Sequence, residues 1–123
     1  MEPSVRYIVE DVAVAVAFYE RLGFENVGPD TEGFAMLRGH GLRLLLNQPG
    51  AGGAGRPADD GATPAPGGWN RIQVEVDDVA DAVDRLLHVG ARVRTSTVKG
   101  RGGSQAVVLD PSGNPVELLA TAG

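Results

Sequence analysis

Hydrophobic and polar positions follow the same pattern in two stretches of the chain, 5–27 and 72–93. In each stretch, an alternation typical of a half-buried strand is followed by apolar positions at helical spacing. An offset of 67 positions places Asp11 on Asp78 and Gly23 on Gly90. Aspartate is a common N-cap of a helix, and glycine commonly ends one. The pattern therefore predicts a duplicated strand–helix unit.

The remainder of each unit repeats under a different offset of 72, which places 34–46 on 106–118. The turn residues His40 and Gly41 then match Ser112 and Gly113, and the segment 110–115 is rich in turn-forming residues. Each unit is predicted to contain a strand, a helix and two or three antiparallel strands, which gives an α+β fold.

Glycine and proline supply 11 of the 20 residues in the segment 49–68, which predicts a flexible loop between the two units. We therefore expect one domain, 1–123, made of a module 1–48, the loop 49–68 and a module 69–123. The glycine pattern at 50–55 matches that of dinucleotide sites, but proline and aspartate follow it where such a site needs a helix. The loop is either a simple connector or a lid that folds over a ligand.

Composition excludes several classes of function. The chain has 123 residues, no cysteine and a formal net charge of −5, so disulfides and thiolate chemistry are excluded. No stripe of lysine or arginine is evident, which argues against nucleic acid and anionic membranes as partners. Without a recognisable signal peptide or a long apolar run, we expect a cytoplasmic protein that does not enter the membrane.

Two motifs resemble those of a known superfamily. The segment 18–24 reads FYERLGF at the end of the first predicted helix, and 110–118 reads DPSGNPVEL near the end of the chain. Together they resemble the vicinal oxygen chelate superfamily of glyoxalases, bleomycin-resistance proteins and extradiol dioxygenases. The resemblance implies two βαβββ modules in an open, cup-shaped mixed β-sheet, with the helices on its outer face. It also implies a homodimer with binding clefts at or near the interface.

Enzymes of this superfamily usually hold a divalent metal at four strand positions. By the motif alignment and the internal repeat, these positions are Ser4, Leu45, Arg71 and Glu117. Glu117 alone is a credible ligand, because leucine has no donor atom, a serine hydroxyl is a weak one and arginine stays protonated. We therefore predict no catalytic metal and no cofactor.

Strand parity predicts what occupies the cup instead. In the strand 71–76, Arg71, Gln73 and Glu75 point away from the helix layer, and Glu117 joins them from the last strand. Trp69 is either an aromatic wall or part of the core. These groups form either a ligand site or a solvated charge network on a sheet face. The predicted ligand-binding residues are Arg6, Leu45, Asn47, Trp69, Arg71, Gln73, Glu75 and Glu117.

Three functions are consistent with these residues. The first is a metal-free protein that binds a small aromatic or cationic compound, such as an antibiotic. The second is a metal-free enzyme in which Glu117 or Glu75 acts as a general base and Arg71 stabilises an oxyanion. The third is a metal-dependent lyase, isomerase or dioxygenase. We favour binding, because the metal-ligand set is incomplete and an arginine close to a carboxylate keeps that carboxylate charged.

Overall fold

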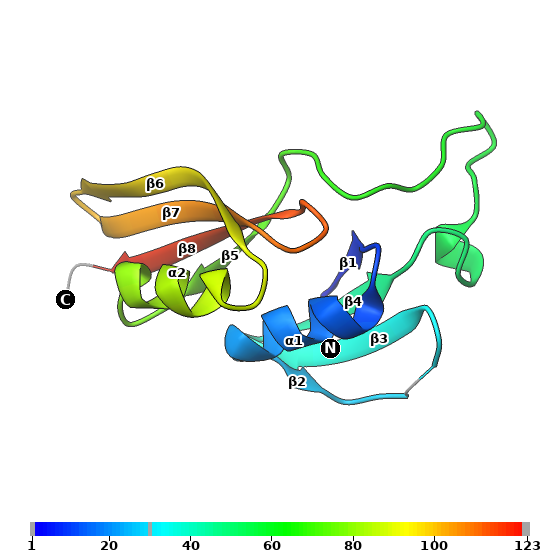
Figure 1. Ribbon diagram of the computed structural model, residues 1–123, viewed down its shortest axis with the longest axis horizontal. Helices are drawn as coiled ribbons and strands as arrows, with labels where there is room; N and C mark the ends of the chain where they lie inside the picture. Colours follow the sequence, from blue (N-terminus) through cyan, green and yellow to red (C-terminus); the bar gives the residue numbers. More distant parts are fainter. Residues whose placement is uncertain (1, 30, 122–123) are drawn as a thin grey trace.

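The computed structural model describes residues 2–29 and 31–121, which form two modules of the same design (Figure 1). Each contains one strand, one helix and three further strands. The first module comprises β1 (Ser4–Ile8), α1 (Val12–Arg21), β2 (Glu25–Asn26), β3 (Phe34–Gly39) and β4 (Leu42–Asn47). The second comprises β5 (Ile72–Glu75), α2 (Val79–Leu87), β6 (Arg92–Gly100), β7 (Gly103–Leu109) and β8 (Pro115–Thr121). The predicted α+β fold of two βαβββ modules is confirmed.

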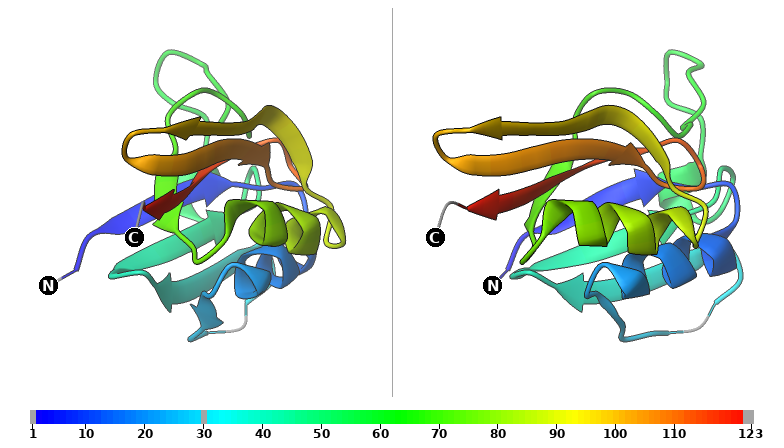
Figure 2. Two further views of the ribbon diagram at one scale, coloured as in Figure 1. Left: turned by 90° about the vertical axis from the view of Figure 1, so that its left-hand side faces the viewer. Right: turned by 60° about the vertical axis from the view of Figure 1, so that its left-hand side comes forward.

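The strands form two four-stranded mixed sheets. Their orders are β1-β4-β3-β2 and β5-β8-β7-β6, and within each sheet the first pair is parallel and the others are antiparallel. Among the described residues, no ladder joins the two sheets. The helices α1 and α2 contact each other and lie side by side where the modules meet (Figure 2).

Both helices begin at the residues that the repeat predicts and end two or three residues before the predicted glycines. The Asp11 side chain accepts a hydrogen bond from the Val14 backbone N–H, and the Asp78 side chain accepts one from Asp81. These caps satisfy backbone donors that have no partner within the helix. Gly23 and Gly90 follow the helices at φ +95° and +94°, a conformation that favours glycine.

One face of each sheet is covered by its helix, and the alternation of side chains agrees with the predicted parity. In β5, Ile72 and Val74 are buried while Gln73 and Glu75 are exposed. We call the face that points away from the helix the open face of each sheet. The core between helices and sheets includes edge-to-face pairs of aromatic rings, centred on the fully buried Tyr19.

The strand registers confirm one part of the predicted repeat and correct another. Val5 pairs with Leu44 in the first module and Ile72 pairs with Val116 in the second, so the offsets of 67 and 72 hold for these strands. Leu46 and Leu118, however, pair with Ala35 and Ala106. β3 therefore matches β7 at an offset of 71, not 72. The turn between β3 and β4 has two residues, whereas 110–114 separate β7 from β8, and this different turn length moves the register by one residue.

Hydrogen bonds from side chains fasten the two modules together. The Tyr7 hydroxyl donates to the Pro115 carbonyl oxygen at 2.9 Å and accepts from the Ile72 backbone N–H at 3.0 Å. The Asn114 side chain donates to the Ile8 carbonyl oxygen at 2.7 Å. These bonds hold the edge strand β1 next to the start of β5.

The carboxylate of Asp110 organises the turn that carries the second sequence motif. It is fully buried and accepts hydrogen bonds from the backbone N–H groups of Ser112 and Asn114, from the Asn114 amide and from the Tyr19 hydroxyl. Tyr19 belongs to the first motif. The two motifs thus meet in space, and their contact supports the fold rather than the open faces.

The segment between β4 and β5 contains only a single turn of 3₁₀ helix, Gly53–Gly55. No helix follows the glycine pattern at 50–55 directly, so the backbone support of a dinucleotide site is missing there. Neither α1 nor α2, nor any other part of the described chain, has the length and apolar character of a helix that crosses a bilayer.

Candidate functional site

Three of the predicted site residues meet on the open face of the second sheet. Parallel pairing of β5 with β8 places Gln73 directly opposite Glu117, and Arg71 lies one residue before β5. Arg71 Nε donates to Glu117 Oε1 at 3.0 Å, and its Nη2 lies 2.8 Å from the same oxygen. Gln73 Nε2 donates to Glu117 Oε2 at 2.5 Å. Both carboxylate oxygens of Glu117 are therefore engaged by donors from β5 and the residue before it.

This arrangement fixes the charge of Glu117. The hydrogen bond from Gln73 lowers the pKa of Glu117 most, and the hydrogen bond and positive charge of Arg71 lower it further, while partial burial opposes them. The Glu117 side chain is 15% exposed and the Arg71 side chain 31% exposed, so the ion pair is partly shielded from water. At neutral pH, Glu117 is an ionised group that is already neutralised by Arg71.

Glu75 and Trp69 lie at the two sides of this cluster. Glu75 is exposed at the end of β5, opposite Leu119 of β8. Trp69 is 70% exposed, which excludes the alternative that it is part of the core. The Arg94 guanidinium lies 4.4 Å from the Trp69 ring centroid and also donates to the Gly68 carbonyl oxygen at 3.1 Å. Trp69 is thereby held at the surface with its indole accessible.

The other predicted site residues, Arg6, Leu45 and Asn47, belong to the first sheet. Leu45 lies opposite Arg6 of β1 and Met36 of β3, and it is partly buried. Arg6 Nη1 donates a hydrogen bond to Asn47 Oδ1. Asn47 is 3% exposed and also donates to the Ala51 carbonyl oxygen at 3.4 Å. Asn47 therefore positions Arg6 and the start of the connecting segment.

Two cavities border Arg6. A cleft of about 360 Å³ lies between β1 and the start of β5 and is lined by both Arg6 and Arg71. A second cavity, of about 390 Å³, is lined by Arg6, Asn47 and the segment 51–54, and on its other side by Thr31, Glu32 and Phe34. The structure thus brings Arg6 and Arg71 to one cleft, whereas Leu45, Trp69, Gln73, Glu75 and Glu117 line neither cavity.

Sequence reasoning missed other residues that line the cleft between β1 and β5. They include Asn70, Asn114 and Tyr7. Burial raises the pKa of the Tyr7 hydroxyl, which therefore stays protonated at neutral pH. Asn114 belongs to the second motif and could have been considered on that ground. The alternation of side chains in β1 places Tyr7 on the helix side of the sheet, and nothing in the sequence indicates that its hydroxyl reaches the other module.

The residues at the four metal-ligand positions do not fit a divalent metal. Arg71 directs its guanidinium at the single carboxylate, and Ser4 and Leu45 offer one weak donor between them. Neither histidine lies among these positions. His40 hydrogen-bonds the Leu22 carbonyl oxygen, and His88 hydrogen-bonds that of Asp84. Within residues 2–29 and 31–121, no group of three or more His, Cys, Asp or Glu side chains could hold a metal ion.

Comparison with known proteins agrees with this architecture. The family model for the glyoxalase-like domain matches residues 5–119. No curated protein matches the chain significantly.

Solved structures with the same fold cover nearly all of the chain. A glyoxalase/bleomycin resistance protein/dioxygenase family enzyme from Burkholderia phytofirmans PsJN has a TM-score of 0.80 at 22% identity, over 97% of both chains. A superfamily member from Sphaerobacter thermophilus DSM 20745 has a TM-score of 0.69 at 25% identity, over 98% of this chain and 96% of that one. An antibiotic-binding protein from Streptomyces sp. CB03234 has a TM-score of 0.68 at 24% identity, over 97% of this chain and 93% of that one. Because the family match spans almost the whole sequence, the chain belongs to the glyoxalase-like domain family, in the superfamily that its two motifs predict.

Proposed function

We propose that this protein binds a small organic molecule without a metal ion, through the open faces of its sheets and the cleft between β1 and β5. The observation that carries this proposal is the state of Glu117. Arg71 and Gln73 donate hydrogen bonds to its two carboxylate oxygens. These are the atoms through which Glu117 would otherwise coordinate a metal ion. What is left at the site is a set of fixed polar groups beside a cleft, which is typical of a binding site.

The same contacts disfavour catalysis by Glu117 as a general base. A carboxylate base works best when its pKa is raised toward the working pH. In this protein, Gln73 and Arg71 lower the pKa of Glu117. The enzyme alternative would then depend on Glu75, which is exposed to solvent on the same face.

We propose an aromatic compound, or a cationic one such as an antibiotic, as the ligand. The exposed indole of Trp69 offers a flat surface for stacking, and Glu75 offers a negative charge for a basic substituent. The likeness to an antibiotic-binding protein from Streptomyces is a fold-level analogy that supports testing such compounds first. We also propose a cytoplasmic homodimer in which a second copy encloses the open faces.

A thermal-shift screen against aromatic antibiotics, aldehyde adducts and acyl thioesters tests the proposal. A ligand that binds only the folded state raises the melting temperature. The shift should fall by at least about half in Arg71→Ala and persist in Arg101→Ala, which removes an exposed arginine from the β6–β7 turn.

Two outcomes contradict the proposal. Stoichiometric nickel, zinc, iron or manganese in protein purified without chelator would show that a metal binds despite the residues present. Loss of folding in Arg71→Ala would show that the Arg71–Glu117 pair stabilises the sheet rather than the ligand.

A further inference from the structure

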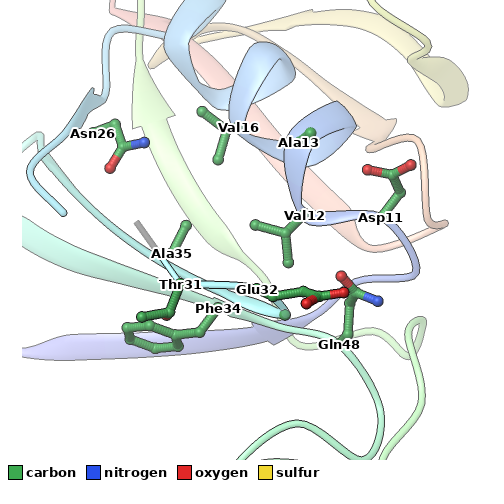
Figure 3. Close-up of a pocket in the computed structure, with 11 residues that line it drawn as sticks. Asp11, Val12, Ala13, Val16, Asn26, Thr31, Glu32, Phe34, Ala35 and Gln48 are labelled. Carbon is green, nitrogen blue, oxygen red and sulfur yellow. The ribbon is translucent and has the colours of Figure 1, made fainter. Parts of the chain in front are cut away.

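A groove lies on the helix side of the first module, and it shares Thr31, Glu32 and Phe34 with the cavity that Arg6 borders. It has a volume of about 560 Å³ and is bordered by the start of α1, by Asn26 of β2, by residues 31–33 and by β3 (Figure 3). The proposed function does not use this groove. We call it the α1 groove.

The lining of the α1 groove has an apolar part and an acidic part. Val12, Val16 and Ala35 provide the apolar part. Both Asp11 and Glu32 line the groove, and the Glu32 carboxylate lies beside the Gln48 amide (Figure 3). The lining includes no lysine, arginine or histidine.

In the part of the chain that the structure describes, the two carboxylates form no ion pair, although Glu32 also lines the cavity that Arg6 borders. One oxygen of Asp11 accepts the capping hydrogen bond from Val14, and its second oxygen makes no further hydrogen bond within the described residues. The acidic part is thus electrostatically suited to a cation supplied from outside the chain.

The internal repeat provides a built-in comparison, because the second module has a cavity in the same place. That cavity is lined by Asp78, Val79 and Ala80, which are the repeat counterparts of 11–13. Its volume is about 300 Å³, and Thr97 and Lys99 of β6 line it. The first module has only the two-residue strand β2 where the second has the nine-residue strand β6. The short β2 therefore leaves more space in the first module, and no lysine counterpart lies beside its carboxylates.

We propose that the α1 groove binds a small amphipathic cation, with an ammonium or guanidinium group on an apolar body. The cationic group lies between Asp11 and Glu32, where it gains charge-assisted hydrogen bonds. The apolar body covers Val12, Val16 and Ala35, which removes apolar surface from water. The volume suits a ligand of this size, because small-molecule pockets span roughly 300–1,000 Å³.

Titration of the ¹⁵N-labelled full-length protein with 2-phenylethylammonium tests this proposal. NMR chemical shifts of backbone amides at 11–16 and 31–35 should change in a saturable way, while those around Arg71 and Glu117 should not. The neutral analogue 2-phenylethanol should bind more weakly, and so should the cation at high salt, because salt screens the carboxylates. Glu32→Gln should weaken binding of the cation by about two- to fivefold, as expected for a partly exposed ion pair.

A matched pair of variants separates the groove from general effects of charge. Ala13→Lys places an ammonium group at the α1 groove and should abolish binding, whereas Ala80→Lys places it at the repeat counterpart and should leave binding unchanged. Both alanines are exposed on helices, so both variants should keep the wild-type melting temperature.

If 2-phenylethanol and 2-phenylethylammonium bind equally well, the proposal that the carboxylates recognise the charge is wrong. If the amide shifts at 11–16 do not change in a saturable way, the proposal that the ligand binds in the α1 groove is wrong. Shift changes confined to the open faces would assign the cation to the ligand site of the proposed function instead. Because Arg71→Ala should leave binding to the α1 groove intact, either proposal can fail without the other.

Discussion

Glu117 shows how the neighbours of a residue select one chemistry from several. A partly buried glutamate on a strand can ligate a metal, transfer a proton or pair with a cation. Arg71 cannot lose its proton, and together with Gln73 it occupies both oxygens of Glu117. Glu117 is therefore held in an ion pair, and this contact supports the proposed binding of a ligand without a metal.

The lowered pKa of Glu117 predicts a pH dependence of stability. Because Gln73 and Arg71 favour the ionised form in the folded state, the contribution to stability is present above the ordinary glutamate pKa of about 4.5. It is lost as the pH falls through the lower pKa of the folded protein. Urea unfolding at pH 7 and pH 3.5 should show a smaller loss of stability for Glu117→Gln than for the wild type. The exposed Glu20→Gln should behave like the wild type, and an equal acid loss in all three proteins would contradict the assignment.

At the scale of elements, the sequence is a good guide wherever a side chain's environment follows from its own strand or helix. The caps at Asp11 and Asp78 and the alternation in β5 are local properties, and they are predicted correctly. The match of β3 to β7 depends instead on the lengths of two turns, and the sequence prediction is wrong by one residue there. The two-residue length of β2 also depends on tertiary contacts, so the space of the α1 groove could not be predicted.

The end of α2 supports a prediction about backbone conformation. Gly90 has φ +94°, and a Cβ added there would lie 3.1 Å from Pro111 Cγ. Gly90→Ala should therefore lower the free energy of unfolding by about 1–2 kcal/mol, as expected for a non-glycine residue in the left-handed region. Gly100→Ala is the control, because Gly100 has no positive φ and a Cβ there would meet no atom within 4 Å. Its effect should stay within about 0.5 kcal/mol. Equal effects in urea unfolding would contradict the conformational argument.

At the scale of the whole molecule, the two modules are joined by residues that break the repeat. Tyr7 supplies the hydroxyl that bonds to Ile72 and Pro115, but its counterpart at an offset of 67 is Val74. The Asn114 side chain donates a hydrogen bond to the Ile8 carbonyl oxygen of the first module. At an offset of 72, the counterpart of Asn114 in the first module is Leu42, which is apolar. A comparison of the two copies identifies what they share. It could not have predicted the junction, which depends on contacts between residues more than 60 positions apart in the chain.

The two tyrosines provide a test of this junction and of the core together. The chain contains only Tyr7 and Tyr19, and burial raises the pKa of both hydroxyls above the ordinary value of 10.0; the nearby Asp110 carboxylate raises that of Tyr19 further. The folded state therefore favours the protonated phenols, and this contribution to stability is lost as the pH rises above about 10. Tyrosinate absorbance at 295 nm should consequently rise together with loss of the folded circular dichroism signal. In Tyr7→Phe, absorbance and unfolding should still coincide, because Tyr19 is fully buried in the core. Tyrosinate formation in protein that remains folded just above pH 10 would show that the hydroxyls are accessible, and would contradict both the junction and the burial of Tyr19.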